Sequence, residues 1–266
     1  MSPERFKKIR EKALEFLGVT AIDRTELKEF AGLVSWVASI IKAARPYTQM
    51  IWAAACAKPA GWETAGKVAA RRVRLPMRWF AEMAKGGESV RSKCYLIQQP
   101  KQKATLTFDA SLTGGGAWLQ IHGGPMNYMY CDWTDEDWAV LGVKAKDPKH
   151  QPEWEAFMCL VAITTWAHLF TDDVGKLSIR GDAQGVLQAA IKGRARMPKL
   201  NEIIAEMQLR FAHTKFDLAA LHIWSEKNAI CDALSRLSEG AAFPEECSRW
   251  QRWPRLHREW GVLGRD

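Results

Sequence analysis

The stretch HIWSEKNAICDALSR, residues 222–236, joins a strand pattern to a helix pattern near the end of the chain. Residues 216–224 are rich in apolar residues and β formers, which predicts a strand. Residues 228–237 have the spacing of a short helix that packs on one face. Asp232 lies inside that helix among apolar neighbours. The stretch therefore predicts a strand and a helix that carries a carboxylate towards the rest of the domain.

The elements upstream of this stretch alternate in a definite order. Three β patterns come first, at 104–110, 117–122 and 127–131, and their short spacing predicts an antiparallel meander. Gly114 to Gly116 predict a turn between the first two strands. The remaining elements are a helix over 152–170, a strand over 176–181, and helices over 183–191 and 198–213. With the closing strand and helix, the order is β-β-β-α-β-α-α-β-α.

Four carboxylates occur within or at the ends of these otherwise apolar elements: Asp109, Glu155, Asp182 and Asp232. Acids at strand ends and on helices packed against a sheet can converge on one point. Without a cation they would repel one another and their pKa values would rise. Hard oxygen ligands suit Mg²⁺ or Mn²⁺. The pattern therefore predicts a shared site for a divalent metal.

Each of these acids also has a simpler interpretation. Asp182 can cap the helix that follows it, and Glu155 can face solvent. Asp232 can pair with Arg236 at i,i+4. Glu153 competes with Glu155 for the helix position, but Glu155 lies on an apolar stripe, so we expect Glu155 to be the ligand.

Several short motifs resemble those of ribonuclease H domains in retroelement reverse transcriptases of the gypsy and DIRS types. In the closing stretch a His is followed by Asn six residues on, by Asp ten residues on, and then by Ala-Leu-Ser-Arg. The other motifs are TFDAS at 107–111 with GGGA at 114–117, WEA at 154–156, and GDAQ at 181–184. The resemblance covers about residues 104–238. It departs from the family at Trp224-Ser225, where Pro-Gly is common, and at Cys231, where Ala is usual.

The resemblance implies a fold, a reaction and a metal requirement. The fold is α/β, with a mixed five-stranded sheet, three strands antiparallel and then two parallel, flanked by helices and preceded by a basic helical domain. The reaction is endonucleolytic hydrolysis of the RNA strand of an RNA–DNA hybrid with two Mg²⁺ or Mn²⁺ ions. Asp109 would bridge both ions, Glu155 and Asp182 would hold one, and Asp232 the other. Glu155 would also contact a 2′-hydroxyl.

Two polar residues of the closing stretch carry further implied roles. His222 would assist product release or transfer protons near neutral pH; alternatively it is a strand-end histidine hydrogen-bonded in the core. Asn228 would contact nucleic acid or cap the last helix.

Positive charge is concentrated in the first part of the chain. Residues 1–103 hold 20 Lys and Arg against 9 Asp and Glu, a net +11, whereas residues 104–266 hold 18 against 21. This asymmetry favours an anionic partner, with nucleic acid as the leading class. The candidate phosphate-binding residues are Arg71, Arg72 and Arg74, with a second basic stretch at Lys192, Arg194 and Arg196, where some relatives carry a basic substrate-binding protrusion.

The sequence predicts three regions. Residues 1–100 look like the helical stretch between polymerase palm and ribonuclease H, a thumb- or connection-like region. Residues 104–238 form the ribonuclease H-like domain, and 239–266 a Trp-rich tail. No Tyr-x-Asp-Asp motif occurs, so we expect no polymerase active site.

Composition limits the cellular setting. The six cysteines are scattered without metal-site spacing, which favours free thiols and an intracellular location. The N-terminus has no signal-peptide pattern, and the longest apolar run, 31–44, is too short to span a bilayer.

Three other functions remain open at this point. The chain can be a catalytically silent, domesticated subunit that acts as a structural or RNA-binding component of a larger ribonucleoprotein. It can be another nuclease with the same fold, such as a resolvase or transposase, although the closing motif argues against this. It can also be one part of a polyprotein that works with the polymerase of a reverse transcriptase.

Overall fold

The computed structural model describes residues 3–59, 63, 66–85, 102–170, 174–211, 216–257 and 260–263. The chain divides into two compact units, Met1–Ile97 and Gln98–Asp266. The predicted boundary at residues 100–104 lies partly outside the described residues. Within the ranges described, no helix combines the length and hydropathy needed to cross a membrane.

The first unit is helical, as predicted, with a short two-stranded ribbon. Its elements are α1 (Pro3–Leu17), β1 (Ala21–Asp23), α2 (Arg24–Ile40), η1 (Lys42–Ala44), α3 (Arg45–Cys56), β2 (Lys67–Ala69), η2 (Ala70–Val73) and α4 (Arg74–Lys85). Asp23 caps α2 by accepting hydrogen bonds from the backbone amides of Thr25 and Glu26. Edge-to-face contacts of Phe30 with Phe16 and Phe80 join α1, α2 and α4 in one core.

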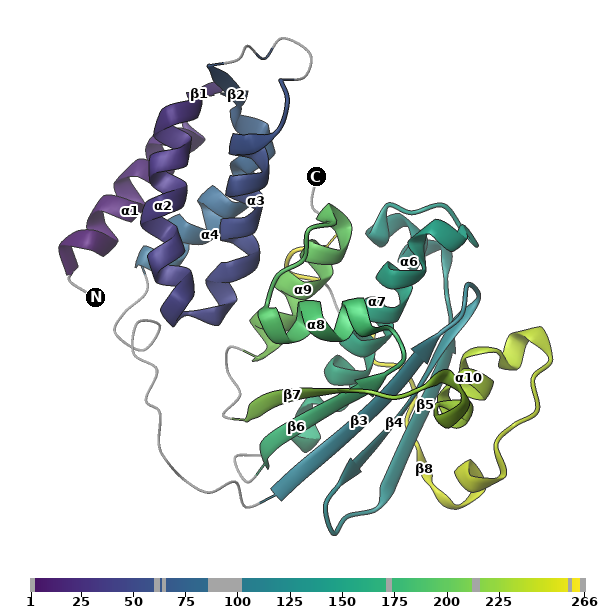
Figure 1. The fold of residues 1–266 in the computed structure, drawn as a ribbon. Coiled ribbons are helices and arrows are strands. Elements are labelled where there is room, and N and C mark those ends of the chain that lie inside the picture. Colours follow the sequence, from purple (N-terminus) through teal and green to yellow (C-terminus); the bar gives the residue numbers. More distant parts are fainter. Residues whose placement is uncertain are drawn as a thin grey trace. The chain divides into compact units, whose positions relative to one another are not determined.

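The second unit is built on a mixed sheet in the order β7-β6-β3-β4-β5-β8 (Figure 1). The strands are β3 (Gln102–Ala110), β4 (Gly114–Ile121), β5 (Met126–Asp132), β6 (Val174–Gly181), β7 (Asp217–His222) and β8 (Gln251–Arg252). Strands β3, β4 and β5 form an antiparallel meander, whereas β6 is parallel to β3 and β7 is parallel to β6. The predicted sheet type is therefore confirmed.

The sheet has one strand more than predicted. The two-residue β8 pairs parallel with Asn127 and Tyr128 of β5. A strand of this length has no periodicity for a sequence pattern to reveal. It covers the edge that β5 would otherwise expose.

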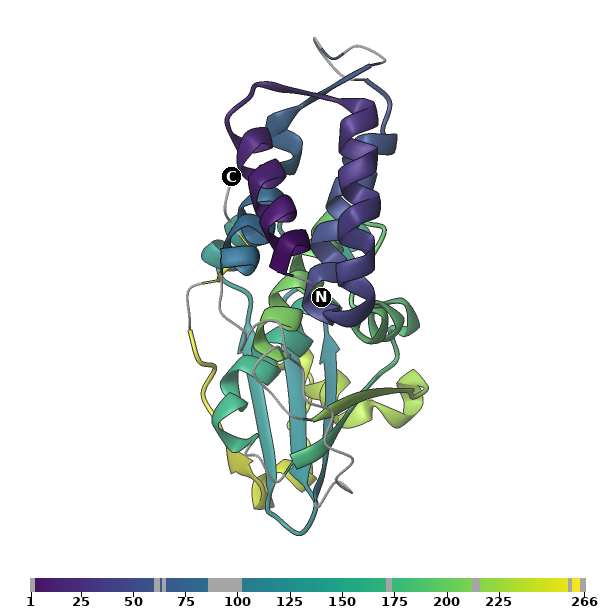
Figure 2. The same ribbon diagram turned by 90° about the vertical axis from the view of Figure 1, so that its left-hand side faces the viewer.

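Helices cover both faces of this sheet (Figure 1 and Figure 2). They are α6 (Asp135–Leu141), α7 (Gln151–Thr165), α8 (Gln184–Lys192), α9 (Pro198–Phe211) and α10 (Ala229–Ser235). The short 3-10 helices of this unit are η3 (Pro148–His150), η4 (Ala167–Leu169), η5 (Ser225–Lys227), η6 (Leu237–Glu239) and η7 (Glu245–Arg249). All residues of α7 from Glu153 onwards are buried, because the sheet contacts one side of this helix and α9 the other.

The predicted turn at Gly114–Gly116 is wrong, because these glycines open strand β4. A Cβ at Gly115 would overlap Sδ of Met158 on α7, and a Cβ at Gly116 would overlap Cβ of Leu234 on α10. Neighbouring strand residues point to opposite faces. The glycines therefore let one helix approach each face of the sheet closely.

The Trp-rich tail packs onto the second unit. The indole nitrogen of Trp253 donates to Oδ1 of Asn127 at 2.8 Å, and Trp260 makes an edge contact with Phe157 of α7. Arg255 forms a buried, two-point ion pair with Asp137 at the start of α6. The tail is thus part of the core of this unit.

Candidate metal centre

The sheet and α7 bring three of the four predicted acids together. Asp109 lies near the end of β3, and Asp182 directly follows β6, its parallel neighbour. Because the two strands run in the same direction, both acids lie at the same end of the sheet. Glu155 reaches this point from α7. One carboxylate oxygen of each residue lies within 4.8 Å of those of the other two.

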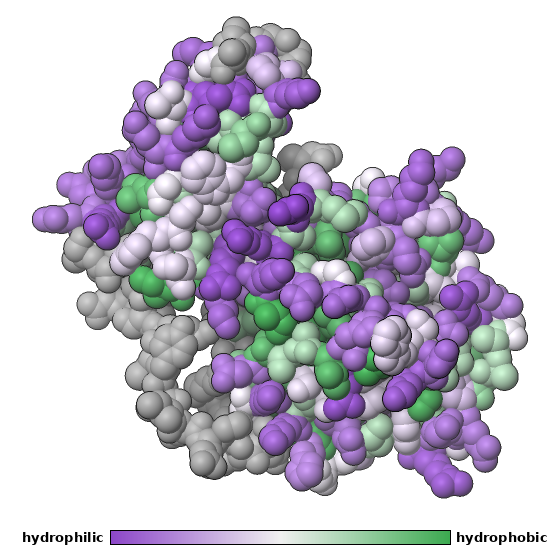
Figure 3. Space-filling view, in the orientation of Figure 1, coloured by the Kyte–Doolittle hydropathy of each residue, from purple (hydrophilic) through white to green (hydrophobic). Residues whose placement is uncertain are grey.

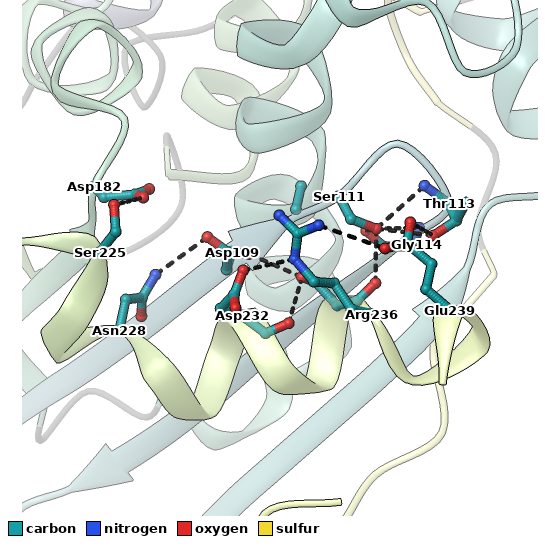
Figure 4. Close-up of polar contacts among 12 residues, drawn as sticks. Asp109, Ser111, Thr113, Gly114, Asp182, Ser225, Asn228, Asp232, Arg236 and Glu239 are labelled. Atoms are coloured by element: carbon teal, nitrogen blue, oxygen red, sulfur yellow. Dashed lines mark hydrogen bonds and ion pairs between the residues drawn. The ribbon is translucent and has the colours of Figure 1, made fainter. Parts of the chain in front are cut away.

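Asp109 is held by two side chains from the closing stretch (Figure 4). The Ser235 hydroxyl donates to Oδ2 of Asp109 at 2.8 Å, and the Asn228 amide donates to Oδ1 at 3.3 Å. Asn228 also donates to the carbonyl oxygen of Phe108 at 3.1 Å. It stands at the N-cap position of α10 but makes no capping hydrogen bond with its side chain. The predicted cap is therefore wrong, and the amide fixes the end of β3 instead.

Burial dominates the electrostatics of two of the acids. Removal from water, reinforced by the charges of Asp182 and Asp232, raises the pKa of Asp109 to about 7, although the hydrogen bond from Ser235 lowers it. Burial, followed by the charges of Asp109 and Asp182, raises the pKa of Glu155 well above its ordinary value. A cation placed between these groups would offset both effects.

Glu155 also has an unused ligand atom. Its Oε1 accepts a hydrogen bond from Nε2 of Gln151 at 3.2 Å, while Oε2 is buried and has no hydrogen-bond partner among the described residues. Glu153, two residues earlier, is equally buried but lies outside the three-acid group, with an oxygen 3.7 Å from Nδ1 of His150. The structure therefore brings Glu155, not Glu153, to the other acids.

The other two predicted ligands have polar partners on the surface of the cleft. The Ser225 hydroxyl donates to Oδ2 of Asp182 at 2.6 Å. Asp232 is half exposed and forms an ion pair with Nε of Arg236 at 2.7 Å, which is the pairing that the sequence left open. Arg236 also contacts Glu239 at 3.4 Å. Asp232 thus faces the cleft but lies outside the group of three (Figure 4).

These residues surround an open cleft of about 450 Å³. Its lining comprises Asp109, Ala110, Gln151, Pro152, Glu155, Asp182, Ala183, Gly185, Val186, Ser225, Asp232 and Arg236. All four predicted acids are therefore accessible from one opening. Three converging carboxylates, one with an unpartnered buried oxygen, match the hard donor set that Mg²⁺ or Mn²⁺ prefers.

His222 and the predicted basic residues lie away from this lining. His222 is exposed at the end of β7, with its ring centroid 5.2 Å from that of Trp224, so the interpretation of a core histidine is wrong. Arg72 forms a 2.8 Å ion pair with the buried Glu63. The other basic residues are exposed: Arg71 and Arg74 in the first unit, Lys192 at the end of α8, and Arg194 and Arg196 between α8 and α9.

Three residues that orient the acids were not predicted: Gln151, Ser225 and Ser235. Ser235 and Ser225 were visible within the closing motif, but a serine beside an acid carries no specific signal for a hydrogen bond between distant elements. Gln151 donates to the carbonyl oxygen of Ala110 at 2.5 Å as well as to Glu155, which links α7 to the end of β3. No pattern in the sequence marks it.

Comparison with known proteins gives a likeness to solved structures and none to described families. No protein-family model and no curated protein matches the chain. Among solved structures, the chain is similar to RNase H1 from the halophilic archaeon Halobacterium salinarum NRC-1, with 19% sequence identity and a TM-score of 0.37. This likeness covers 53% of the present chain and 99% of the archaeal one. The fold assignment itself rests on the strand order and directions described above.

Proposed function

We propose that the chain is a metal-dependent ribonuclease H that hydrolyses the RNA strand of RNA–DNA hybrids. The observation that carries the proposal is the convergence of Asp109, Glu155 and Asp182, with oxygens within 4.8 Å, in an open cleft. Burial of Asp109 and Glu155 with raised pKa values is unfavourable for the stability of the metal-free protein, so their presence together favours a catalytic use.

The three acids would hold the divalent metal. When bound, such an ion lowers the pKa of a water nucleophile and stabilises charge on the leaving oxygen. The protein's own contribution is orientation: Ser235 and Asn228 fix Asp109, Gln151 fixes Glu155, and Ser225 fixes Asp182. Such supporting hydrogen bonds usually matter nearly as much as the ligands themselves.

Asp232 is the proposed ligand of a second ion. Its carboxylate would have to exchange Arg236 for the metal, because Arg236 now neutralises it at 2.7 Å. The released guanidinium would remain at the cleft, which it already lines. There it can donate to two oxygens of a substrate phosphate in the bidentate manner that arginine favours.

Other residues would bind or serve the substrate. His222 is exposed three residues before the cleft-lining Ser225, and we propose that it assists product release or proton transfer. The basic residues Arg71, Arg74, Lys192, Arg194 and Arg196 would contact phosphates with salt-dependent affinity. Arg72 is paired with Glu63, so it would stabilise the local fold rather than contact the substrate.

We further propose that the chain derives from a retroelement reverse transcriptase. The motifs around Asp109 and Asp232 support this origin, and the helical first unit is compatible with a thumb- or connection-like region. The polymerase part of such an enzyme, or a larger ribonucleoprotein, is the proposed partner.

A second candidate function is a catalytically silent subunit that binds RNA. The specific observation in its favour is the Asp232–Arg236 ion pair, which neutralises the charge of one of the four acids. In that case the cleft would bind nucleic acid without cleaving it.

The two functions differ in a direct assay. The full chain is incubated with labelled RNA–DNA hybrid, duplex DNA and duplex RNA, with Mg²⁺ or with EDTA. The proposal expects cleavage of the hybrid alone, dependent on Mg²⁺ and abolished by Asp109→Asn. Binding of the hybrid without cleavage would support the silent subunit, and undiminished cleavage by Asp109→Asn would contradict the site.

A further inference from the structure

The segment between β7 and α10 presents an aromatic ring to solvent beside the cleft. Trp224 is 69% exposed, more than any other large apolar side chain in the described part of the chain. Leu221, on the same strand end, is 51% exposed. Trp224 directly precedes Ser225, which lines the cleft and donates to Asp182. An indole next to the carboxylate site is thus available for contact with whatever occupies the cleft.

Local contacts hold this segment in place. On one side of Trp224, the amide of Ile223 donates to the carbonyl of Gly181 at 3.0 Å. On the other, the Trp224 carbonyl accepts from the amide of Lys227 at 2.8 Å. The His222 ring packs edge-on against the indole, with an interplanar angle of 80°. A ring held by its neighbours binds with a smaller entropy cost than a mobile one.

We propose that Trp224 is a stacking platform for an unpaired base of the nucleic acid bound at the carboxylate cleft. This inference rests on the proposed function, because the carboxylate cleft defines where the nucleic acid lies. Aromatic side chains stack on bases of any sequence. Bases inside a duplex already stack on their neighbours, so an exposed ring can take only a base from an unpaired nucleotide.

A protein partner fits this surface less well. A stable protein interface buries about 800 Å² on each side, and the exposed large apolar side chains at this position are Leu221 and Trp224. On the face drawn in Figure 3, hydrophobic side chains are interspersed with hydrophilic ones. One exposed indole next to an acidic cleft can stack on a flat base of the nucleic acid that occupies the cleft. The ligand that fits both features is therefore a hybrid with a single-stranded extension.

Binding experiments with the full chain test the proposal. Glu155→Gln is used as the background to prevent cleavage in Mg²⁺, and anisotropy compares a blunt RNA–DNA hybrid with hybrids that carry a short unpaired extension at each strand end in turn. We expect tighter binding of at least one extended hybrid. Trp224→Leu should remove that preference, a loss of about fivefold to about 100-fold, as typical of base–aromatic stacking. Trp224→Phe should keep most of it, and Leu221→Ala is the exposed apolar control.

A 2-aminopurine placed in the extension reports stacking directly. Its fluorescence should be quenched on binding to the protein with the native Trp224 and to W224F, but much less on binding to W224L. Equal affinity for blunt and extended hybrids, or an equal loss for both in W224L, would overturn the stacking proposal. If the protein with native Glu155 still cleaves the blunt hybrid, the proposed function survives that result. Failure to bind or cleave any hybrid would contradict both the stacking proposal and the proposed function.

Discussion

Ser235 and Asp109 are 126 residues apart in the sequence, yet the Ser235 hydroxyl donates a hydrogen bond of 2.8 Å to Oδ2 of Asp109. Both side chains are buried. The bond favours the ionised form of Asp109 and opposes the effect of burial on its pKa. The closing helix therefore contributes more than its own acid to the candidate metal centre.

Removing this hydroxyl should weaken metal binding. Without it the pKa of Asp109 rises further above about 7, so a larger fraction is protonated at neutral pH and cannot act as a ligand. We expect Ser235→Ala to lower Mg²⁺ affinity by about 10- to 100-fold near neutral pH. The pH at which binding appears should also move upwards. Titration calorimetry over a pH series measures both effects, with the exposed Ser248→Ala as control.

The raised pKa of Asp109 also predicts how stability depends on pH. The unfolded carboxyl loses its proton near its ordinary pKa of 3.8, whereas the folded one keeps it up to about 7. The folded state therefore binds more protons between these values, and the metal-free protein loses stability as pH rises through this window. Above it the penalty stays constant.

Asp109→Asn removes this penalty. In EDTA at about pH 8, we expect the variant to be more stable than the wild type by roughly 1–3 kcal/mol, with little difference near pH 4. Mg²⁺ should stabilise only the wild type at the higher pH. Urea unfolding at both pH values measures this. A variant less stable than the wild type at both would contradict the assigned burial of a carboxylate without a cation.

The glycines of β4 allow a sharper test of packing. A Cβ at Gly116 would lie 2.7 Å from the carbonyl oxygen of Cys231, a backbone atom that cannot move without displacing α10. We expect Gly116→Ala to destabilise the second unit by about 1–3 kcal/mol and to reduce metal affinity, because α10 carries Ser235. Gly185→Ala meets nothing within 4 Å and should stabilise α8 by about 0.5–1 kcal/mol. Equal effects of the two substitutions on unfolding would refute this packing.

Much of the second unit was predictable from the sequence because each element has its own periodicity. The strand at 104–110 corresponds to β3 at Gln102–Ala110, and the helix at 198–213 to α9 at Pro198–Phe211. The helix predicted to reach residue 170 instead ends at Thr165, followed by a single turn. Acids stood out where they interrupted apolar elements. An acid that interrupts an apolar element is visible within that element, so one sequence is enough to detect it.

Contacts between distant segments were not predictable in the same way. Nothing in the sequence pairs Arg255 in the tail with its partner Asp137, which lies 118 residues earlier. Ser235 reads as an ordinary helix residue, although it donates to Asp109. The triple glycine reads as a turn, because only the packed helices reveal why it lacks side chains. These relationships depend on the assembled fold and leave no periodic pattern.

The Arg255–Asp137 ion pair predicts a role for the tail in stability. Both side chains are less than a tenth exposed, so Arg255→Ala leaves a buried carboxylate without its cation. The expected cost is about 3–5 kcal/mol in the second unit. Lys7→Ala, which breaks the exposed pair with Glu11, should cost about 0–0.5 kcal/mol. Hydrogen–deuterium exchange under increasing urea measures the free energy of unfolding of each unit separately. Similar losses of stability in the two variants would show that the tail does not stabilise the core of the second unit.

Two glutamates on one helix give the most direct test of the proposed nuclease site. Glu153 and Glu155 are both buried on α7, but only Glu155 belongs to the three-acid group. In a cleavage assay on an RNA–DNA hybrid with Mg²⁺, Glu155→Gln should reduce the rate by more than about 100-fold, since a ligand is worth more than its supporting contacts. Glu153→Gln should retain activity close to that of the wild type. Wild-type cleavage by Glu155→Gln, or an equal loss in both variants, would contradict the account.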